Sequence, residues 1–249
     1  PNTLEILGMA SLPTFDPNVY WQYADRPDFA MNRAVSSQFE PGSTFKIVTL
    51  AGAVEEGLFD PDATYMSGRI NVAGTVMGDH NNRQGWGEIT YLEGLKRSSN
   101  VAFIKLGYEM LGAEKLRSYI EKFGFGQPTG IELPGEIKGK IDFRYPAEVA
   151  NATFGQGVTV TAIQQIAAIS VVANGGNLMK PLLVKQVLDP ATGEVLESYE
   201  PQVVRRVISE QTAREVRDYL EQVVSDQHIG TGRRVYLDGY RVAAKTGTA

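Results

Sequence analysis

The sequence contains no cysteine, and this absence removes several kinds of chemistry at once. Without thiols the chain cannot form disulfides, use a thiolate nucleophile or bind zinc through cysteine. The absence fits a protein that works outside the cytoplasm without needing bridges. Histidine is scarce as well, and only His80 and His228 are present. Neither has a ligand cluster or triad partners at a useful spacing, so we expect loop or surface positions for both, with no metal and no cofactor.

The sequence also lacks a membrane-spanning run, a signal peptide and a concentrated basic face, and these absences narrow the class of protein. No run reaches the roughly 18 uninterrupted apolar residues of a membrane-spanning helix, and the start of the chain does not resemble a signal peptide. Any export or anchoring signal is therefore expected upstream. Lysine and arginine are evenly scattered and the formal net charge is −5. This argues against nucleic acid as a partner, because phosphate neutralisation needs a concentrated basic face.

The 249 residues, 43% of them hydrophobic, are enough to bury a large core. Helical patterns are expected at residues 43–56, 90–95, 113–123, 159–172 and 209–224. Strand patterns occupy residues 4–10, 183–188, 194–199 and 240–248, of which the middle two are joined as a β-hairpin. Strands at both ends with helices between them predict an α/β sandwich that carries a helical insertion.

The first motif with a chemical meaning is Ser43-Thr44-Phe45-Lys46. Residues three apart share a face of a helix, so we expect the Lys46 amine beside the Ser43 hydroxyl. There a neutral amine could take the proton as the oxygen attacks a carbonyl carbon, and burial would lower the lysine pKa towards that role. The pair alone is weak, since a serine and a lysine at this spacing also occur by chance, with the lysine exposed and paired to a carboxylate.

Two more motifs are equally weak when each is taken alone. Ser98-Ser99-Asn100 lies between two helical patterns, where it could point polar side chains into a cleft or serve as an ordinary helix cap. Lys245-Thr246-Gly247-Thr248 ends the last predicted strand. Its ammonium and hydroxyl groups make a carboxylate receptor and Gly247 permits close approach of a substrate backbone, although the segment could also be an exposed strand end.

The order Ser-x-x-Lys, Ser-x-Asn, Lys-Thr-Gly is the signature of penicillin-binding proteins and serine β-lactamases. Along nearly its whole length the chain resembles the class B penicillin-binding proteins, which are monofunctional transpeptidases. Besides the motifs, the resemblance is carried by Glu5-Ile6-Leu7-Gly8-Met9-Ala10-Ser11, Phe15-Asp16-Pro17-Asn18, Asn32-Arg33-Ala34, Phe39-Glu40-Pro41-Gly42, Gly155-Gln156-Gly157 and Gly230-Thr231-Gly232.

The resemblance implies catalytic roles for five side chains. Ser43 is the nucleophile that becomes acylated, and Lys46 is its base. Ser98, helped by Lys245, passes a proton to the leaving D-Ala amine. Asn100 holds the backbone amide of the donor peptide. The implied reaction is transfer of an acyl group from one cell-wall peptide to an amine of a neighbouring strand, without metal or cofactor.

The resemblance also implies how the substrate is bound. Thr246 and Thr248 receive its terminal carboxylate beside Gly247, and the backbone N–H groups of Ser43 and Thr248 form the oxyanion hole. Ser99 stands where many β-lactamases carry aspartate, and no Glu-x-x-Leu-Asn segment supplies a deacylating carboxylate. These departures favour a slowly hydrolysing synthase over a β-lactamase.

The fold that the resemblance implies is the α/β (α+β) fold of penicillin-binding proteins and serine β-lactamases, an antiparallel sheet flanked by helices. Residues 1–249 are expected to form the transpeptidase domain, with a helical subdomain at roughly residues 60–155. Members of this fold continue past the Lys-Thr-Gly strand into two strands and a helix. We therefore expect a domain truncated at both ends, with its remaining part on another chain or removed.

The expected partners follow from the same resemblance. They are peptidoglycan pentapeptide stems, β-lactams as covalent inhibitors, and a membrane-embedded glycan polymerase with other cell-wall synthesis proteins. The expected location is the bacterial cell membrane, with a single-pass anchor upstream and the catalytic domain outside the cytoplasm. Two alternatives use the same fold, a β-lactam sensor domain and a non-catalytic scaffold of the division or elongation machinery.

Overall fold

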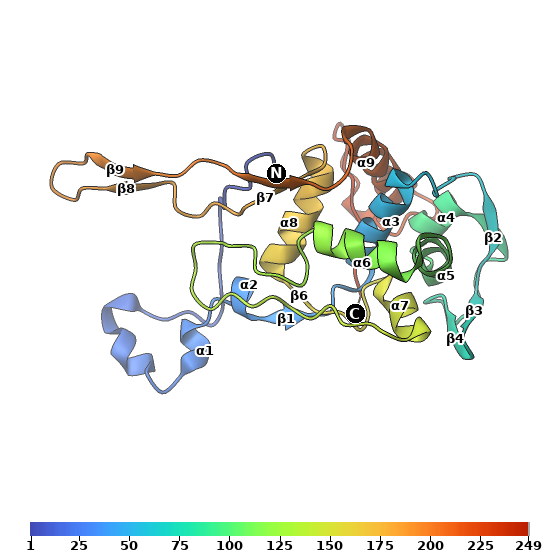
Figure 1. The fold of residues 1–249 in the computed structure, drawn as a ribbon, viewed down its shortest axis with the longest axis horizontal. Helices are drawn as coiled ribbons and strands as arrows, with labels where there is room; N and C mark the ends of the chain where they lie inside the picture. Colours follow the sequence, from blue (N-terminus) through green and yellow to red (C-terminus); the bar gives the residue numbers. More distant parts are fainter. Residues whose placement is uncertain (249) are drawn as a thin grey trace.

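The computed structural model describes residues 1–248, and one buried helix, α3 (Lys46–Glu55), lies at the centre of its helical body (Figure 1). The helix contacts α5 (Asn100–Ile104), α6 (Gly112–Lys122), α8 (Ala162–Ala173) and α9 (Glu210–Ser225). Apolar side chains surround α3 on nearly all sides, so neighbours can cover it completely. The buried helix predicted over residues 43–56 is confirmed.

Local capping explains where several helices begin. The Ser209 hydroxyl accepts the N–H of Thr212 at the start of α9, as the sequence predicted. Thr161 and Gln164 form a reciprocal capping box at the start of α8. Thr90 caps α4 (Tyr91–Lys96) with a single bond, in which its hydroxyl oxygen accepts the N–H of Glu93. The predicted helices near residues 90–95, 113–123, 159–172 and 209–224 are therefore confirmed, with shifted ends.

The expectation of one antiparallel sheet is wrong for the described residues. Within residues 1–248 the strands pair as five separate antiparallel two-stranded ladders. The pairs are β1 (Gln38–Phe39) with β6 (Val160–Thr161), β2 (Thr64–Met66) with β5 (Glu88–Thr90), β3 (Arg69–Val72) with β4 (Thr75–Gly78), β7 (Asn177–Met179) with β10 (Val203–Arg206), and β8 (Gln186–Leu188) with β9 (Val195–Ser198).

The two predicted end strands are also wrong. In residues 4–10 the pairing is limited to one parallel bridge between Glu5 and Leu182, and residues 240–248 contain no strand. In the latter segment the N–H of Ala244 donates to the carbonyl of Leu220 in α9 at 3.3 Å. A strand requires a repeating ladder of partners, and among residues 1–248 these segments find only isolated ones. Their extended sequence pattern could not reveal that.

Shorter elements complete the chain. They are η1 (Pro17–Tyr23), α1 (Pro27–Ala30), α2 (Arg33–Ser36), η2 (Gly42–Phe45), η3 (Lys105–Leu111), α7 (Pro146–Ala152) and η4 (Arg233–Val235). The predicted β8–β9 hairpin is confirmed, and it projects from the helical body on the same side as η1 and α1 (Figure 1).

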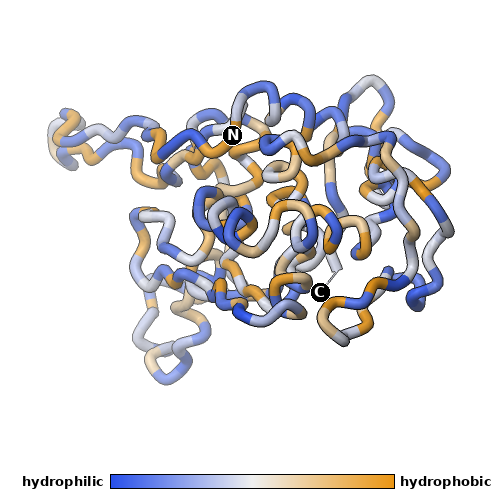
Figure 2. Tube along the Cα trace, turned by 45° about the vertical axis from the view of Figure 1, so that its right-hand side comes forward, coloured by the Kyte–Doolittle hydropathy of each residue, from blue (hydrophilic) through white to orange (hydrophobic). Residues whose placement is uncertain are grey.

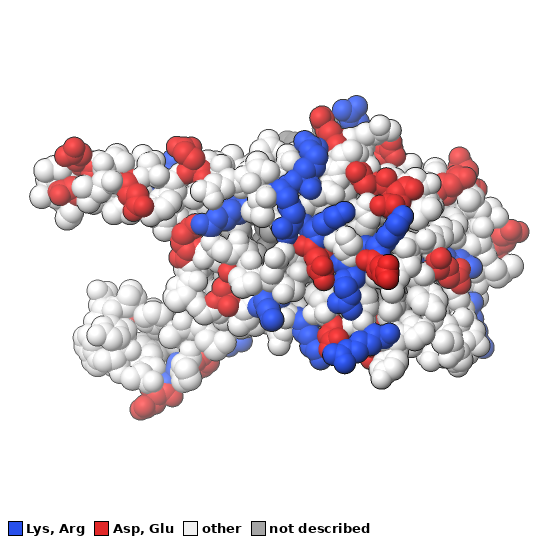
Figure 3. Space-filling view, in the orientation of Figure 1, with Lys and Arg blue, Asp and Glu red and all other residues white. Residues whose placement is uncertain are grey.

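Apolar and charged residues are distributed differently in the helical body and in the β8–β9 hairpin that projects from it. Apolar segments gather in the interior of the body (Figure 2), where α3, α6, α8 and α9 share one hydrophobic core. Basic and acidic side chains are interspersed on the face of the body in Figure 3, whereas the hairpin displays mainly acidic ones. Among residues 1–248, no helix has both the length and the apolar character needed to cross a bilayer.

Candidate active site

The three sequence motifs meet at one cleft of about 280 Å³. The residues that line it are Ser43, His80, Ser98, Asn100, Phe154, Gln156, Thr231, Thr246 and Thr248. Five of these were singled out from the sequence. The two predicted lysines, Lys46 and Lys245, are buried beside the cleft and reach it through hydrogen bonds to Ser98. Gly247 lies against the Thr44 side chain next to Ser43.

Ser43 reaches the cleft because a short 3-10 turn, η2, precedes α3. The turn begins at Gly42, which has a φ of +51°, and the Lys46 backbone N–H donates to the Ser43 carbonyl. The serine side chain is thus half-buried at the mouth of the central helix, with the lysine one turn further in. Unpaired N–H groups at such a helix start favour negative charge that develops on a nearby oxygen.

Lys46 is fully buried, and its Nζ is directed at the Ser-x-Asn motif. It donates to the Ser98 carbonyl and to Asn100 Oδ1, both at 2.8 Å, and lies 3.2 Å from Ser98 Oγ. Within the described chain these are its hydrogen bonds, and none is made to Ser43 Oγ. Burial and then the charge of Lys245 lower the pKa of Lys46 well below its ordinary value, while Asp79 acts in the opposite direction.

These contacts fit a neutral Lys46. A neutral amine has two N–H bonds and one lone pair. The Ser98 carbonyl and Asn100 Oδ1 can only accept, so they take both N–H bonds. The lone pair is then left for a hydroxyl proton, which either Ser98 or an attacking serine can supply. The arrangement therefore prepares Lys46 to act as a base.

Lys245 contacts the same hydroxyl as Lys46. Its Nζ donates to Ser98 Oγ at 2.7 Å and to the Thr246 carbonyl at 3.2 Å. Burial lowers the pKa of Lys245 to about 7, which makes it able to give or take a proton near neutrality. Ser98 Oγ thus connects two buried amines, each with a lowered pKa. This geometry can carry a proton between them and a group in the cleft.

Both interpretations of the middle motif turn out to be correct, for different residues. Ser99 is the helix cap, since its Oγ accepts the N–H of Ala102 at the start of α5. Ser98, with a φ of +59°, turns its side chain towards the lysines instead. Asn100 follows and lines the cleft. Because the backbone of Ser98 is left-handed, Ser98 and Asn100 face the cleft while Ser99, between them, caps α5.

Sequence reasoning missed the place of His80. A loop position was predicted and is confirmed, but the residue also lines the cleft together with the motifs. Its Nε2 lies 2.9 Å from the Arg97 carbonyl, and its ring packs against Trp86 at 5.6 Å between centroids. No local pattern in the sequence signals this, because the cleft forms only when the β3–β4 hairpin folds back on α5.

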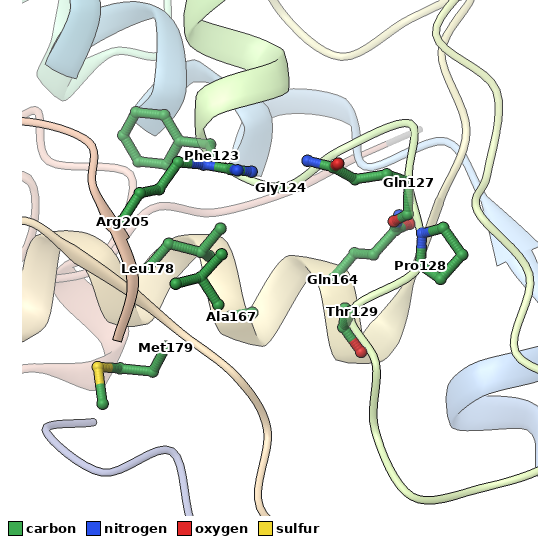
Figure 4. Close-up of a pocket in the computed structure, with 11 residues that line it drawn as sticks. Phe123, Gly124, Gln127, Pro128, Thr129, Gln164, Ala167, Leu178, Met179 and Arg205 are labelled. Carbon is green, nitrogen blue, oxygen red and sulfur yellow. The ribbon is translucent and has the colours of Figure 1, made fainter. Parts of the chain in front are cut away.

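A second, smaller hollow of about 80 Å³ lies between the end of α6, α8 and the β7–β10 ladder (Figure 4). Its polar side chains bond to the surrounding backbone. Gln164 Nε2 donates to the carbonyls of Gln127 and Lys138, and Arg205 donates to those of Lys122 and Glu121. Gln164 therefore joins two loop residues to α8, and Arg205 joins strand β10 to the end of α6.

The position of Ser43 depends on a close approach at Gly155. A Cβ there would lie 2.3 Å from the Gly42 carbonyl oxygen and 2.7 Å from Phe45 Cβ, whereas one at Gly157 would meet nothing within 4 Å. Both glycines have positive φ, so they share the backbone cost of a side chain. We expect Gly155→Ala to lower the free energy of unfolding by about 2 kcal/mol more than Gly157→Ala. Equal losses in chemical denaturation would contradict the assigned contact.

The family model described as the penicillin binding protein transpeptidase domain matches residues 1–249. The chain is 46% identical over 254 residues to stage V sporulation protein D of Bacillus subtilis, covering 100% of this chain and 38% of that protein. It thus spans well under half the length of that curated relative.

Two solved structures resemble the fold. The crystal structure of penicillin binding protein 3 from Mycobacterium tuberculosis complexed with aztreonam matches with a TM-score of 0.80 and 36% identity, over 88% of this chain and 50% of that one. The D,D-transpeptidase domain of a peptidoglycan glycosyltransferase from Eggerthella lenta matches with a TM-score of 0.84 and 32% identity, over 96% of this chain and 62% of that one.

Proposed function

The chain belongs to the family of penicillin-binding protein transpeptidase domains, and we propose that it is a serine D,D-transpeptidase that cross-links peptidoglycan stem peptides through an acyl-enzyme. The observation that carries this proposal is the arrangement of Ser43 and Ser98 in one cleft with two buried amines on Ser98. The resemblance to class B penicillin-binding proteins, seen in the sequence, is confirmed.

Acylation begins with Ser43. Its Oγ attacks the carbonyl carbon of the penultimate D-Ala, and the hydroxyl proton passes to the neutral amine of Lys46. The negative charge that forms on the carbonyl oxygen is held by the backbone N–H groups of Ser43 and Thr248. Each such donor stabilises the transition state by about 3 kcal/mol. Asn100 holds the donor peptide's amide during this step.

Collapse of the tetrahedral intermediate breaks the C–N bond to the terminal D-Ala. Its amine leaves with a proton delivered through Ser98 Oγ, which Lys46 and Lys245 both contact. Thr246 and Thr248 bind the carboxylate of this terminal residue beside Gly247. The acyl ester on Ser43 is then attacked by an amine from a neighbouring strand, whose proton takes the reverse route and restores the serine hydroxyl.

The same cleft explains covalent inhibition. A β-lactam presents a strained amide carbonyl and a nearby carboxylate, so Ser43 and the two threonines can receive it as they receive the peptide. Relatives of known structure are described as complexes with aztreonam and with ampicillin, which supports this proposal. Because the lactam nitrogen stays attached after the ring opens, no leaving group departs and the ester persists.

We also propose a cellular location and partners for the whole protein. We place the catalytic domain outside the cytoplasm of a bacterium, anchored in the cell membrane, with a glycan polymerase and other cell-wall synthesis proteins as partners. Residues 60–155 form its helical subdomain.

The decisive experiment measures turnover of a synthetic stem pentapeptide that ends in D-Ala-D-Ala, with an acceptor amine present. The full chain is expected to release one D-Ala for each cross-linked product, followed by mass spectrometry. Labelling by penicillin without release of D-Ala would instead favour the sensor alternative. If neither reaction occurs, the alternative that remains is a non-catalytic scaffold of the same fold.

A further inference from the structure

A buried carboxylate that the proposed mechanism does not use lies directly beneath the cleft. Asp79 follows β4 and is 2% exposed. It is separated from the Ser-x-Asn motif by 18 residues of chain yet contacts it directly. Buried acidic side chains are uncommon and need partners for every oxygen. What Asp79 contacts therefore indicates what it does.

Both carboxylate oxygens are engaged. Oδ1 accepts the Ser99 hydroxyl at 2.7 Å and the Val101 backbone N–H at 3.0 Å, and Oδ2 accepts the Gly68 backbone N–H at 2.8 Å. Two of these three donors are backbone groups that cannot reverse their polarity. An asparagine would place an NH₂ against one of them in either orientation. The site therefore requires a group that only accepts.

These bonds hold the turn that presents the catalytic side chains. Ser99 lies between Ser98 and Asn100, and its Oγ both caps α5 and donates to Asp79. Next to the aspartate, the Gly78 carbonyl accepts Asn100 Nδ2 at 3.2 Å, which orients Oδ1 towards Lys46. The left-handed conformation of Ser98 is costly for a residue with a side chain, so it needs such restraint.

Asp79 also contributes charge to the site. Within the described residues, the ionisable groups that influence Lys46 are Lys245, which lowers its pKa, and Asp79, which raises it. Tyr65 from β2 is buried nearby, and burial, with a smaller contribution from Asp79, raises the pKa of its hydroxyl. Ser98 and Asn100, from the turn, and the rings of Phe103 and Phe154 complete the surroundings of Lys46 without ionising.

We propose that Asp79 is a positioning residue of the transpeptidase, whose ionised carboxylate holds the Ser98-Ser99-Asn100 turn in register with the two buried lysines. The inference rests on the proposed function. It adds a fourth element to the three motifs, supplied by the end of β4 and the residue that follows it. Through Gly78 and Asp79, this segment is then part of the catalytic architecture.

Two variants separate the roles of hydrogen bond and charge. Asp79→Asn removes the charge and leaves one backbone N–H without an acceptor, and we expect the acylation rate by fluorescent penicillin to fall about 100-fold. Ser99→Ala removes one bond to the carboxylate and the N-cap of α5 but keeps the charge of Asp79, and a loss of roughly tenfold is expected. Asp189→Asn is the matched control, because Asp189 also accepts two backbone N–H groups, in the distant β8–β9 turn.

The pH dependence of acylation distinguishes positioning from a merely structural role. In a plot of acylation rate against pH, the acid limb is the fall in rate at low pH. It reports the pKa of the group that must lose a proton, here Lys46. Removing a nearby negative charge makes protonation harder, so Asp79→Asn is expected to move this limb to lower pH. Ser99→Ala should leave the limb in place. The measurement is made on the full chain of each variant, with circular dichroism to establish that it is folded.

The outcomes are distinct. If folded Asp79→Asn is acylated like wild type, or slows without a shifted limb, the positioning role is wrong while the transpeptidase proposal stands. If wild type itself is not acylated, the proposed function fails first. If Asp79→Asn does not fold, Ser99→Ala carries the test, and an unchanged rate in that folded variant overturns the inference.

Discussion

Replacing Ser43 with alanine is expected to abolish covalent labelling by fluorescent penicillin, with a fall in acylation rate of about 10⁴-fold or more. We proposed this oxygen as the one that forms the ester because, among the described residues that line the cleft, Ser43 is the one whose hydroxyl belongs to the turn before the central helix. The fold should survive, because Ser43 is half-buried and its hydroxyl lies on the cleft wall.

The control for this prediction is Ser225→Ala, which removes an exposed hydroxyl from the last residue of α9. That variant should label at the wild-type rate. Mass spectrometry of the labelled peptide must find the adduct on Ser43 in wild type. Persistent labelling of Ser43→Ala at another residue would remove the nucleophile assignment, and with it the acyl-enzyme.

Lys46→Arg is expected to reduce acylation about 10³-fold, the usual contribution of a positioned base. Arginine retains the positive charge, but a guanidinium stays protonated in proteins, so it cannot become neutral and take a proton. Wild-type Lys46 can do so because burial lowers its pKa. The guanidinium also presents more donors than the Ser98 carbonyl and Asn100 Oδ1 can accept.

Stopped-flow acylation of the folded variant tests this prediction. Lys105→Arg serves as control, because Lys105 forms a surface ion pair with Glu109 that arginine can keep. Loss of the wild-type acid limb in the pH profile of Lys46→Arg would accompany the slower rate. A variant that retains near-normal rate and pH profile would show that another group is the base, with Lys245 the next candidate.

Much of the helical framework could be predicted from sequence because its signals are local. Ser209 and Thr161 cap helices with donors only three residues away, and the apolar period of α3 indicates burial on all sides. The two end strands were predicted wrongly for a related reason. Extended patterns show what a segment can do, but a strand exists only when distant residues pair with it.

For the proposed catalytic groups, the sequence by itself predicted which residues would carry the chemistry, and it determined that Ser43 and Lys46 lie one helical turn apart, since spacing along a helix is a local property. Only the tertiary structure decided that Lys46 directs its amine at Ser98 and Asn100, that Lys245 shares the same hydroxyl, and that Asp79 lies beneath them. Those contacts join segments 20 to 147 residues apart. Their geometry depends on the simultaneous packing of several elements around α3, which no single segment encodes.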